Sequence, residues 1–222
     1  MEQNVKRVFD LVLASVGLIA VLPLLLVLAI WIKLDSKGPV FYRGQRAGRR
    51  GRPFCIFKLR TMRVGAEELE HNVTPNDGRA GTRSNDPRIT CAGRPLRRYK
   101  LDELPQLINV VKGDMSLVGP RPEVLDEVQH YSDEERELLT VRPGITDWAS
   151  IRFCEEGDIL GDSEEPSRTY YRDIRPEKIR LGLQYVRHNS LLTDVRIIIY
   201  TLERVLGAYR SPTQFQSRSS SL

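Results

Sequence analysis

LVLASVGLIAVLPLLLVLAIWI, residues 11–32, contains no charged side chain, whereas most of the 222-residue chain is rich in arginine, aspartate and glutamate. A helix over these 22 residues would be roughly 33 Å long, which just matches a hydrocarbon core of about 30 Å. The sequence therefore predicts a membrane segment attached to a water-soluble body.

Pro23 divides this segment into arms of 12 and 9 residues, about 18 and 14 Å long, and neither arm can cross a bilayer alone. Two structures are open: a kinked spanning helix, or a re-entrant helix that turns at Pro23. Basic residues, typical of cytoplasmic flanks, stand on both sides: Lys6 and Arg7 before the segment, and Lys33, Lys37 and Arg43 after it. Both ends are therefore expected on the cytoplasmic side, which favours a re-entrant helix broken at Pro23. A signal peptide fits less well, because the stretch is too long and no small-residue cleavage site precedes the basic block.

The net charge of +5 has a local origin, because residues 36–66 contain nine Lys or Arg and no acid. Such a block is expected to face lipid headgroups, nucleotide phosphates or nucleic acid. No base-reading module appears, so phosphates and headgroups are favoured and nucleic acid is not expected as a partner. Three unpaired cysteines and three scattered histidines argue against a disulfide framework or a zinc site. Walker, dinucleotide, serine hydrolase and zinc hydrolase signatures are absent.

The rest of the chain predicts an α+β fold that is predominantly helical with a small β-hairpin. The hairpin is expected to pair Val40–Arg43 with Phe54–Leu59. Further expected elements are a short helix over 66–71, a loop over 72–85, an extended MSLVG piece, a helix over 123–139, an acidic loop over 155–165 and a helix over 176–188. The predicted organisation is a re-entrant membrane helix over 1–36, a cytoplasmic catalytic domain over 37–210 and a disordered tail over 211–222.

The last predicted helix, residues 191–208, has one apolar stripe with arginines beside it. This pattern is typical of an amphipathic helix at a membrane interface. Plain core packing explains the same stripe, and by the sequence alone it is somewhat favoured.

Asp102 and Glu103 are the residues best suited to chemistry. Apolar residues at helical spacing begin at Leu101, and Pro105 is tolerated only in a first turn, so a helix is expected to start near Asp102. A helix dipole favours ionised carboxylates at this end. An ionised Asp can attack phosphorus while its neighbour holds a divalent cation, although adjacent acids at a helix start are also ordinary capping residues.

Basic residues surround this pair in the sequence: Lys58, Arg60, Arg94, Arg97, Arg98, Lys100 and Arg121. If they converge in the fold, the carboxylates lie among cations that suit a diphosphate. A salt-bridged surface is the alternative.

From about Lys6 to Thr201, the chain resembles the monotopic phosphoglycosyl transferases, also called the bacterial sugar transferase family. The resemblance rests on these motifs: KRVFD (6–10), GPVFY (38–42), FKLRTM (57–62), DPRIT (86–90), LDELPQLINVVKGDMSLVGPRPE (101–123) and RPGIT (142–146). Several motifs in one order make a specific signal.

The resemblance implies transfer of a phosphosugar from a UDP-sugar to polyprenol phosphate, giving polyprenol diphosphosugar and UMP, as a first membrane step in bacterial glycoconjugate or exopolysaccharide assembly. Asp102 matches the nucleophile that forms a covalent intermediate, and Glu103 matches the residue that, with Asp102, binds Mg²⁺. The motifs associated with phosphate and nucleotide binding contain Lys58, Arg60, Arg88, Arg97 and Arg121. Pro23 matches the break in the family's re-entrant helix. The resemblance also implies a place on the cytoplasmic face of a bacterial inner membrane, and a homodimer is one allowed assembly.

Two features depart from the family pattern. Asp147 to Ser150 replace the residues that usually follow RPGIT, and the stretch 155–165 is unusually acidic. Both leave the sugar undetermined rather than the reaction. Larger members of the family carry extra membrane helices and a further domain ahead of this unit, so the chain is expected to be the minimal catalytic form. Two other functions stay open: a non-enzymatic membrane adaptor, and an anchored phosphohydrolase that uses the same carboxylates.

Overall fold

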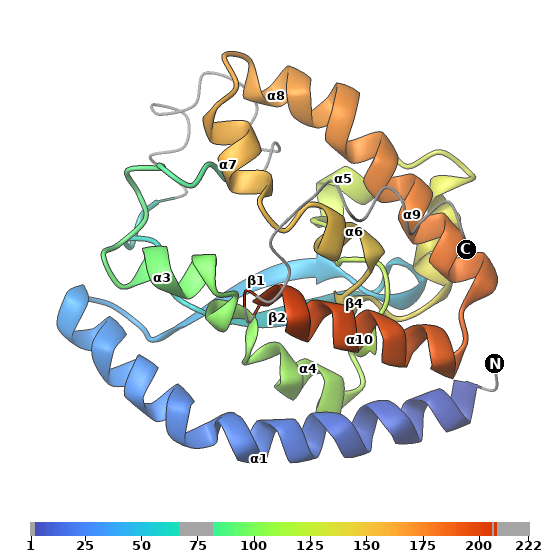
Figure 1. The fold of residues 1–222 in the computed structure, drawn as a ribbon, viewed down its shortest axis with the longest axis horizontal. Coiled ribbons are helices and arrows are strands. Elements are labelled where there is room, and N and C mark those ends of the chain that lie inside the picture. Colours follow the sequence, from blue (N-terminus) through green and yellow to red (C-terminus); the bar gives the residue numbers. More distant parts are fainter. Residues whose placement is uncertain (1–2, 67–81, 206, 208–222) are drawn as a thin grey trace.

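The computed structural model describes residues 3–66, 82–205 and 207. A long N-terminal helix lies below a body made of two small sheets and a set of shorter helices (Figure 1). The fold is therefore mostly helical with a small antiparallel sheet, as predicted. The expected helix over 66–71, most of the expected loop over 72–85 and the expected tail over 211–222 fall outside the described residues.

The N-terminal helix α1 spans Gln3–Asp35 and contains Pro23 without an interruption. Proline removes one backbone donor and crowds the preceding turn, and bends are the usual result. In Figure 1, α1 runs along the lower edge of the molecule and then bends upward. The prediction of a break at Pro23 is not confirmed, because helical structure continues across this residue.

One side of α1 packs against the body of the protein, through Ala14, Leu28 and Ile32. Its other side is apolar yet exposed, with examples in Val16, Ile19, Leu26, Val27 and Ile30. Within the described residues, one helix is long and apolar enough to cross a membrane. Such a face is costly in water, so it indicates a membrane-associated surface.

The predicted hairpin is present. β1 (Phe41–Ala47) pairs antiparallel with β2 (Pro53–Leu59), and Tyr42 lies opposite Lys58. The turn contains the short helix η1 (Arg49–Gly51). Helix α4 (Gln106–Lys112) lies against β2, because the Asn109 amide donates to the Cys55 carbonyl (2.7 Å) and accepts from the Phe57 amide (3.0 Å).

A second sheet joins β3 (Ser116–Val118) to β4 (Gly144–Thr146), which run parallel. The extended MSLVG piece was predicted, but its partner was not. Helix α6 (Trp148–Arg152) follows β4 directly, and the Asp147 carboxylate caps it by accepting from the Ser150 amide at 2.7 Å.

The predicted helix over 123–139 is wrong, since two short elements replace it: α5 (Leu125–Gln129) and η3 (Glu135–Thr140). Ser132 and Glu135 explain the interruption. The Ser132 hydroxyl accepts from the Glu135 amide (3.2 Å), and the Glu135 carboxylate accepts from the Ser132 amide (2.8 Å). This reciprocal pair is a capping box, which starts a new helical segment.

The acidic stretch over 155–165 is also not simply a loop, because residues 156–161 form helix α7 (Glu156–Gly161). Leu160 is completely buried and packs against Tyr170 and Ile174, so the stretch belongs to the folded body. Helix α3 (Gly93–Arg98) comes earlier in the chain. After α7 follow α8 (Pro166–Thr169), the π-turn η4 (Tyr170–Ile174) and α9 (Arg175–His188). The last of these agrees with the predicted helix over 176–188.

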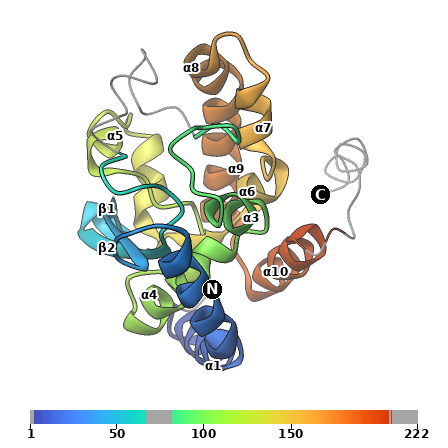
Figure 2. The same cartoon turned by 90° about the vertical axis from the view of Figure 1, so that its left-hand side faces the viewer.

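The final helix, α10 (Leu191–Val205), does not have the core packing that its apolar stripe favoured. Ile197 is buried, but Leu192, Val195, Ile199 and Leu202 on the predicted stripe are 37–62 % exposed. The stripe is therefore not packed into the core. In Figures 1 and 2, α10 and α1 both lie toward the lower side of the molecule, so two exposed apolar faces occur on neighbouring elements.

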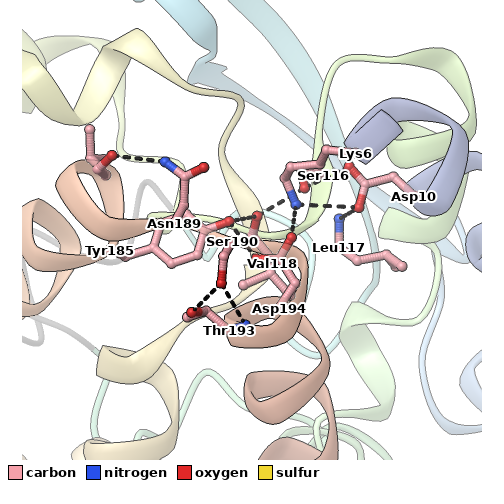
Figure 3. A network of polar contacts seen from close by, with 11 residues as sticks. Lys6, Asp10, Ser116, Leu117, Val118, Tyr185, Asn189, Ser190, Thr193 and Asp194 are labelled. Carbon is pink, nitrogen blue, oxygen red and sulfur yellow. Dashed lines mark hydrogen bonds and ion pairs between the residues drawn. The ribbon is translucent and has the colours of Figure 1, made fainter. Parts of the chain in front are cut away.

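A buried polar network ties α1 to this region (Figure 3). Lys6 donates to the Asp194 carboxylate at 2.7 Å and lies 3.6 Å from Asp10. Asp10 in turn accepts from the Ser116 hydroxyl (2.8 Å), and Asp194 accepts from the Tyr185 hydroxyl (2.8 Å). The first turns of α1 are therefore fixed to β3, α9 and α10 together.

Candidate active site

Asp102 and Glu103 lie in a short 3-10 turn, η2 (Leu101–Glu103), just before α4. Pro105 caps α4, so the acids precede the α-helix rather than open it. The residue before the turn, Lys100, has a left-handed backbone (φ 55°), which is uncommon for a residue other than glycine. Both carboxylate residues are 8 % exposed. The turn thus holds two adjacent acids in a largely buried position.

Glu103 is bound by two cations from other parts of the chain. The Lys58 ammonium on β2 donates to Oε1 at 3.0 Å. The Arg121 guanidinium donates to both oxygens, with Nη1 at 3.1 Å from Oε2 and Nη2 on Oε1. Residues separated by 45 and 18 positions in sequence therefore meet at one carboxylate.

Glu103, Lys58 and Arg121 shift one another's pKa values. Burial alone would raise the pKa of Glu103, but Arg121 and Lys58 outweigh it and hold that pKa well below its ordinary range. Burial lowers the pKa of Lys58 although Glu103 opposes this, and Glu103 raises the pKa of Arg121. The glutamate is therefore ionised at neutral pH by its cations rather than by a helix dipole.

Asp102 is in a different state. No hydrogen bond joins its carboxylate to another of the described residues, although it is as buried as Glu103. Burial raises the pKa of Asp102, the Glu103 carboxylate adds to this effect, and Lys58, Arg97 and Lys100 oppose it. Asp102 thus offers oxygen atoms that the fold leaves uncommitted, beside three cations.

Arg121 is placed by the close approach of the segment after β3 to strand β4. The Gly144 amide donates to the Pro120 carbonyl (2.9 Å), and the Gly119 amide donates to the Thr146 carbonyl (3.0 Å). A Cβ on Gly144 would lie 2.1 Å from the Gly119 nitrogen, so only glycine allows this contact. The Arg121 side chain keeps 40 % of its surface exposed, and it can contact a ligand while bound to Glu103.

Arg97 and Arg88 are two further arginines that the sequence predicted for this site. Burial lowers the pKa of Arg97, and the opposing field of Asp102 comes next in size, which shows that the two are neighbours. Arg88 is buried and pairs with Asp86 through Nη2 at 2.7 Å and Nε at 3.0 Å. Its side chain therefore orders the 86–90 turn, and its predicted role in phosphate binding remains a prediction.

Arg60 lies at a different place from the one its motif suggested. Its guanidinium donates to the Ser36 carbonyl (2.7 Å) and hydroxyl (3.0 Å) and to the Lys37 carbonyl, directly after α1. Gly38 has φ +127°, and a Cβ there would lie 2.1 Å from the Arg60 guanidinium. Arg60 therefore fastens the end of α1 to the hairpin, and it makes no hydrogen bond to either acid.

Sequence reasoning missed a second group of charges on the far side of Arg121: Glu123, Asp147, Glu156 and Lys178. Lys178 bonds Glu156, and burial raises the pKa of Asp147 and of Glu123. The available signal was the departure after RPGIT, since Asp147 stands there. Asn109 was also missed. Its signal in the sequence is a single polar residue within the apolar run of residues 107–111, and the structure buries it completely.

A magnesium ion is compatible with this donor set. No group of three or more acidic, His or Cys residues that could enclose a metal occurs among the described residues. Mg²⁺ usually needs only one or two carboxylates together with substrate phosphates. Asp102 has uncommitted oxygens, and Oε2 of Glu103 accepts a single hydrogen bond from the described residues, so a lone pair remains.

The family model described as bacterial sugar transferase matches residues 1–208. A UDP-glucose:undecaprenyl-phosphate glucose-1-phosphate transferase of Xanthomonas campestris pv. campestris is 40 % identical over 91 % of this chain and 39 % of its own length. An undecaprenyl-phosphate galactose phosphotransferase of Salmonella typhimurium is 37 % identical over 92 % of this chain and 41 % of its own. The exopolysaccharide production protein ExoY of Rhizobium meliloti is 37 % identical over 90 % of this chain and 84 % of its own.

The chain thus spans about two fifths of the first two relatives and most of the third. The family match covers every element that builds the site, from α1 to α10. The chain belongs to the bacterial sugar transferase family.

Proposed function

We propose that this protein transfers a phosphosugar from a UDP-sugar to polyprenol phosphate through a covalent intermediate on Asp102. The observation that carries the proposal is the pairing of an uncommitted, buried carboxylate with a neighbour that is bound by two cations. Two of the relatives are named as transferases that act on undecaprenyl phosphate, which supports the same class of reaction.

In the first step, an oxygen of Asp102 attacks the β-phosphorus, which carries the sugar. The bond from this phosphorus to the bridging oxygen breaks, and the electron pair leaves with UMP. Arg121 is half-exposed and Lys58 lies beside it on Glu103, so both can compensate the charge that develops on the diphosphate. Glu103 holds these two cations in place.

In the second step, a phosphate oxygen of the polyprenol phosphate attacks the same phosphorus. The bond to Asp102 breaks, the free carboxylate returns, and polyprenol diphosphosugar is released. Because UMP has left by then, the two substrates need not be bound together. Arg97 and Lys100 lie close enough to Asp102 to lower its pKa, so they help to keep it ionised as a leaving group.

Asp102 and Glu103 are the residues that would hold Mg²⁺. When bound, this ion would neutralise diphosphate charge and orient the β-phosphorus. Because the described residues supply two carboxylates here, we expect tight binding only when substrate phosphates complete the site. Isothermal titration with Mg²⁺ should give a weak response for the free protein and a stronger one with UMP or a UDP-sugar present.

The position of α1 supports a re-entrant membrane helix. Lys6 near its start bonds to α10, and the Asp35 carboxylate at its end accepts from the Ala92 amide at 3.2 Å. Both ends of α1 therefore contact the same body. A helix across about 30 Å of hydrocarbon would hold its ends on opposite faces of the bilayer, where one compact domain could not contact both. The exposed stripe of α10 extends this surface, so we propose that α10 lies in the headgroup region of the same leaflet.

One experiment separates the three candidate functions: UMP release from a panel of UDP-sugars, with and without polyprenol phosphate. The proposed transferase forms a labelled protein adduct without the lipid and turns over only with it. A phosphohydrolase would turn over without lipid, and an adaptor would release no UMP. The panel also identifies the sugar.

The topology is tested with Asn4→Cys and Lys37→Cys, each in a background where the three native cysteines are replaced by serine. Both positions are exposed: Asn4 lies in the first turn of α1, and Lys37 lies just after its end. In cells, an impermeant thiol reagent from the periplasm should label neither variant, and both should react once the cytoplasm is opened. Periplasmic labelling of one of them would establish a spanning helix instead.

A further inference from the structure

The tip of the β1–β2 hairpin forms a hollow of about 500 Å³, which we name the hairpin-tip hollow. It is lined by Arg49, Arg50, Arg136, Leu139, Thr140, Val141 and Val186. Three of these seven residues are arginines and none is acidic. The strongly one-sided lining is typical of a site for an anion.

The arginines are held by backbone contacts rather than by acids. Arg49 donates through Nε to the Thr140 carbonyl at 2.9 Å, and Arg136 donates through Nε to the Tyr131 carbonyl at 3.3 Å. Within the described part of the chain, neither of them nor Arg50 forms an ion pair. Each guanidinium therefore keeps further N–H groups for a ligand.

The acids closest in sequence are already engaged. Glu134 and Glu137 both bond to Arg187, and Glu135 bonds to Arg175. These pairs neutralise the negative charge of η3 and leave Arg136 in excess. The like charges of Arg50 and Arg142 contribute, after burial, to lowering the pKa of Arg49.

The backbone of the tip supports a functional role for Arg50. Its φ is 60°, in the left-handed region, and the next residue, Gly51, has φ 71°. A non-glycine residue in this region costs about 1 kcal/mol, and glycine would avoid this cost. An arginine at such a position is explained if its side chain binds a ligand at the tip.

The hollow is separate from the acid pair. Lys58 and the tip residue Pro53 lie at opposite ends of β2, about 17 Å apart along the strand. We propose that the hairpin-tip hollow is a second anion site that binds a phosphate group through Arg49, Arg50 and Arg136. Its half-buried floor of Leu139, Val141 and Val186 suits the organic part of a phosphate ester, either a lipid headgroup or a small soluble phosphate.

The test measures how fast phenylglyoxal, an arginine reagent, modifies each arginine of the full chain in lipid nanodiscs, by peptide mass spectrometry. One arm adds inorganic phosphate to discs of phosphatidylcholine. The other compares these discs with discs that contain phosphatidylglycerol and no added phosphate. At a phosphate concentration of four times Kd, the rates at Arg49, Arg50 and Arg136 should fall about fivefold. Arg168, whose side chain is 69 % exposed, serves as the internal reference.

Arg50→Gly is the decisive variant, because glycine suits φ 60° and should leave the thermal midpoint unchanged or higher. In this variant phosphate should protect Arg49 and Arg136 about tenfold more weakly, the usual effect of losing one charge-assisted contact. Arg168→Ala is the matched control and should leave protection intact. Protection in the first arm identifies a soluble phosphate as the ligand, and protection only in the second identifies a lipid headgroup. Absence of protection in both arms, equal protection of Arg168, or full protection in Arg50→Gly would each overturn the proposal.

Discussion

The buried network of Figure 3 and the cluster around Glu103 both join acids to lysine or arginine, and they differ in how completely their carboxylate oxygens are used. In the network of Figure 3, both oxygens of Asp194 accept hydrogen bonds, from Lys6 and from Tyr185. Asp10 likewise accepts from the Ser116 hydroxyl and from the Leu117 amide, at 2.8 and 3.2 Å. Every acid there has protein partners, and the cluster joins secondary-structure elements.

The cluster around Glu103 is incomplete by comparison. Glu103 is bonded, but Arg121 is 40 % exposed and Asp102 forms no hydrogen bond with the described residues. Leaving a buried carboxylate without a partner costs stability, so such a group persists where function requires it. The comparison therefore separates a structural network from the cluster that we propose to be reactive, and the variants below test that separation.

Asp102→Asn should have the largest effect. It removes the proposed nucleophile, and loss of such a group lowers turnover by about 10⁴-fold or more. No acid-stable adduct should form with a UDP-sugar that is labelled in its β-phosphate. The folded state raises the pKa of Asp102, so the ionised form disfavours folding at neutral pH and the variant should melt at a higher temperature. Full turnover in this variant would contradict the assignment of the nucleophile.

Asp194→Asn should act on stability instead. Asp194 is completely buried and bonds to Lys6, and breaking a buried pair is strongly destabilising. Asp10 remains 3.6 Å from Lys6, and burial raises the pKa of Asp194, so the variant also removes an unfavourable buried charge. Both effects reduce the loss, and we expect about 3 kcal/mol in the free energy of unfolding, at the lower end of the usual range. Thermal melts in detergent measure this loss, and activity per folded molecule should stay within about twofold. A lower melting point without lost activity supports a structural network, whereas unchanged stability with tenfold lower activity would reverse it.

The sequence predicted much of the active cluster, but not the geometry of its outer members. Asp102 and Glu103 were found from residue type, and their convergence with Lys58 and Arg121 was stated as a condition, which the contacts with Glu103 now satisfy. Arg60 follows the last residue of β2, where strand geometry no longer directs its side chain, and it turns to α1 instead.

The same limit applies to the fold. The hairpin and α9 could be predicted because local patterns determine them, but the pairing of β3 with β4 joins residues about 28 positions apart. The Ser132–Glu135 capping box was readable in the sequence and marks the start of η3. The exposure of the apolar stripe of α10 could not be predicted from the sequence, because core and membrane surfaces select the same apolar residues.

Lys58→Ala should shift the pH dependence of kcat/KM, with a smaller effect than the two variants above. Lys58 lowers the pKa of Asp102, so removing it should raise that pKa further. Since the attacking form is the carboxylate, the acid limb of kcat/KM should move to higher pH and activity should recover partly at alkaline pH. Lys112→Ala is the control, because this half-exposed side chain pairs with Asp114 and not with Asp102 or Glu103. An acid limb at the same pH as in the unmodified protein would show that Lys58 does not influence the ionisation of Asp102.

Tyr185→Phe should have the smallest effect and test the comparison most finely. The Tyr185 hydroxyl donates to Asp194 at 2.8 Å and to the Val118 carbonyl at 3.1 Å, and its removal leaves one Asp194 oxygen unpaired. Lys6 still neutralises Asp194, so we expect a loss of only about 1 kcal/mol, measured by the same melts. In a double-mutant cycle with Asp194→Ala, the losses of the two single variants should not add, because both remove the hydrogen bond between Tyr185 and Asp194. Additive losses would show that Tyr185 stabilises the fold mainly through Val118, and the network would then be two separate contacts.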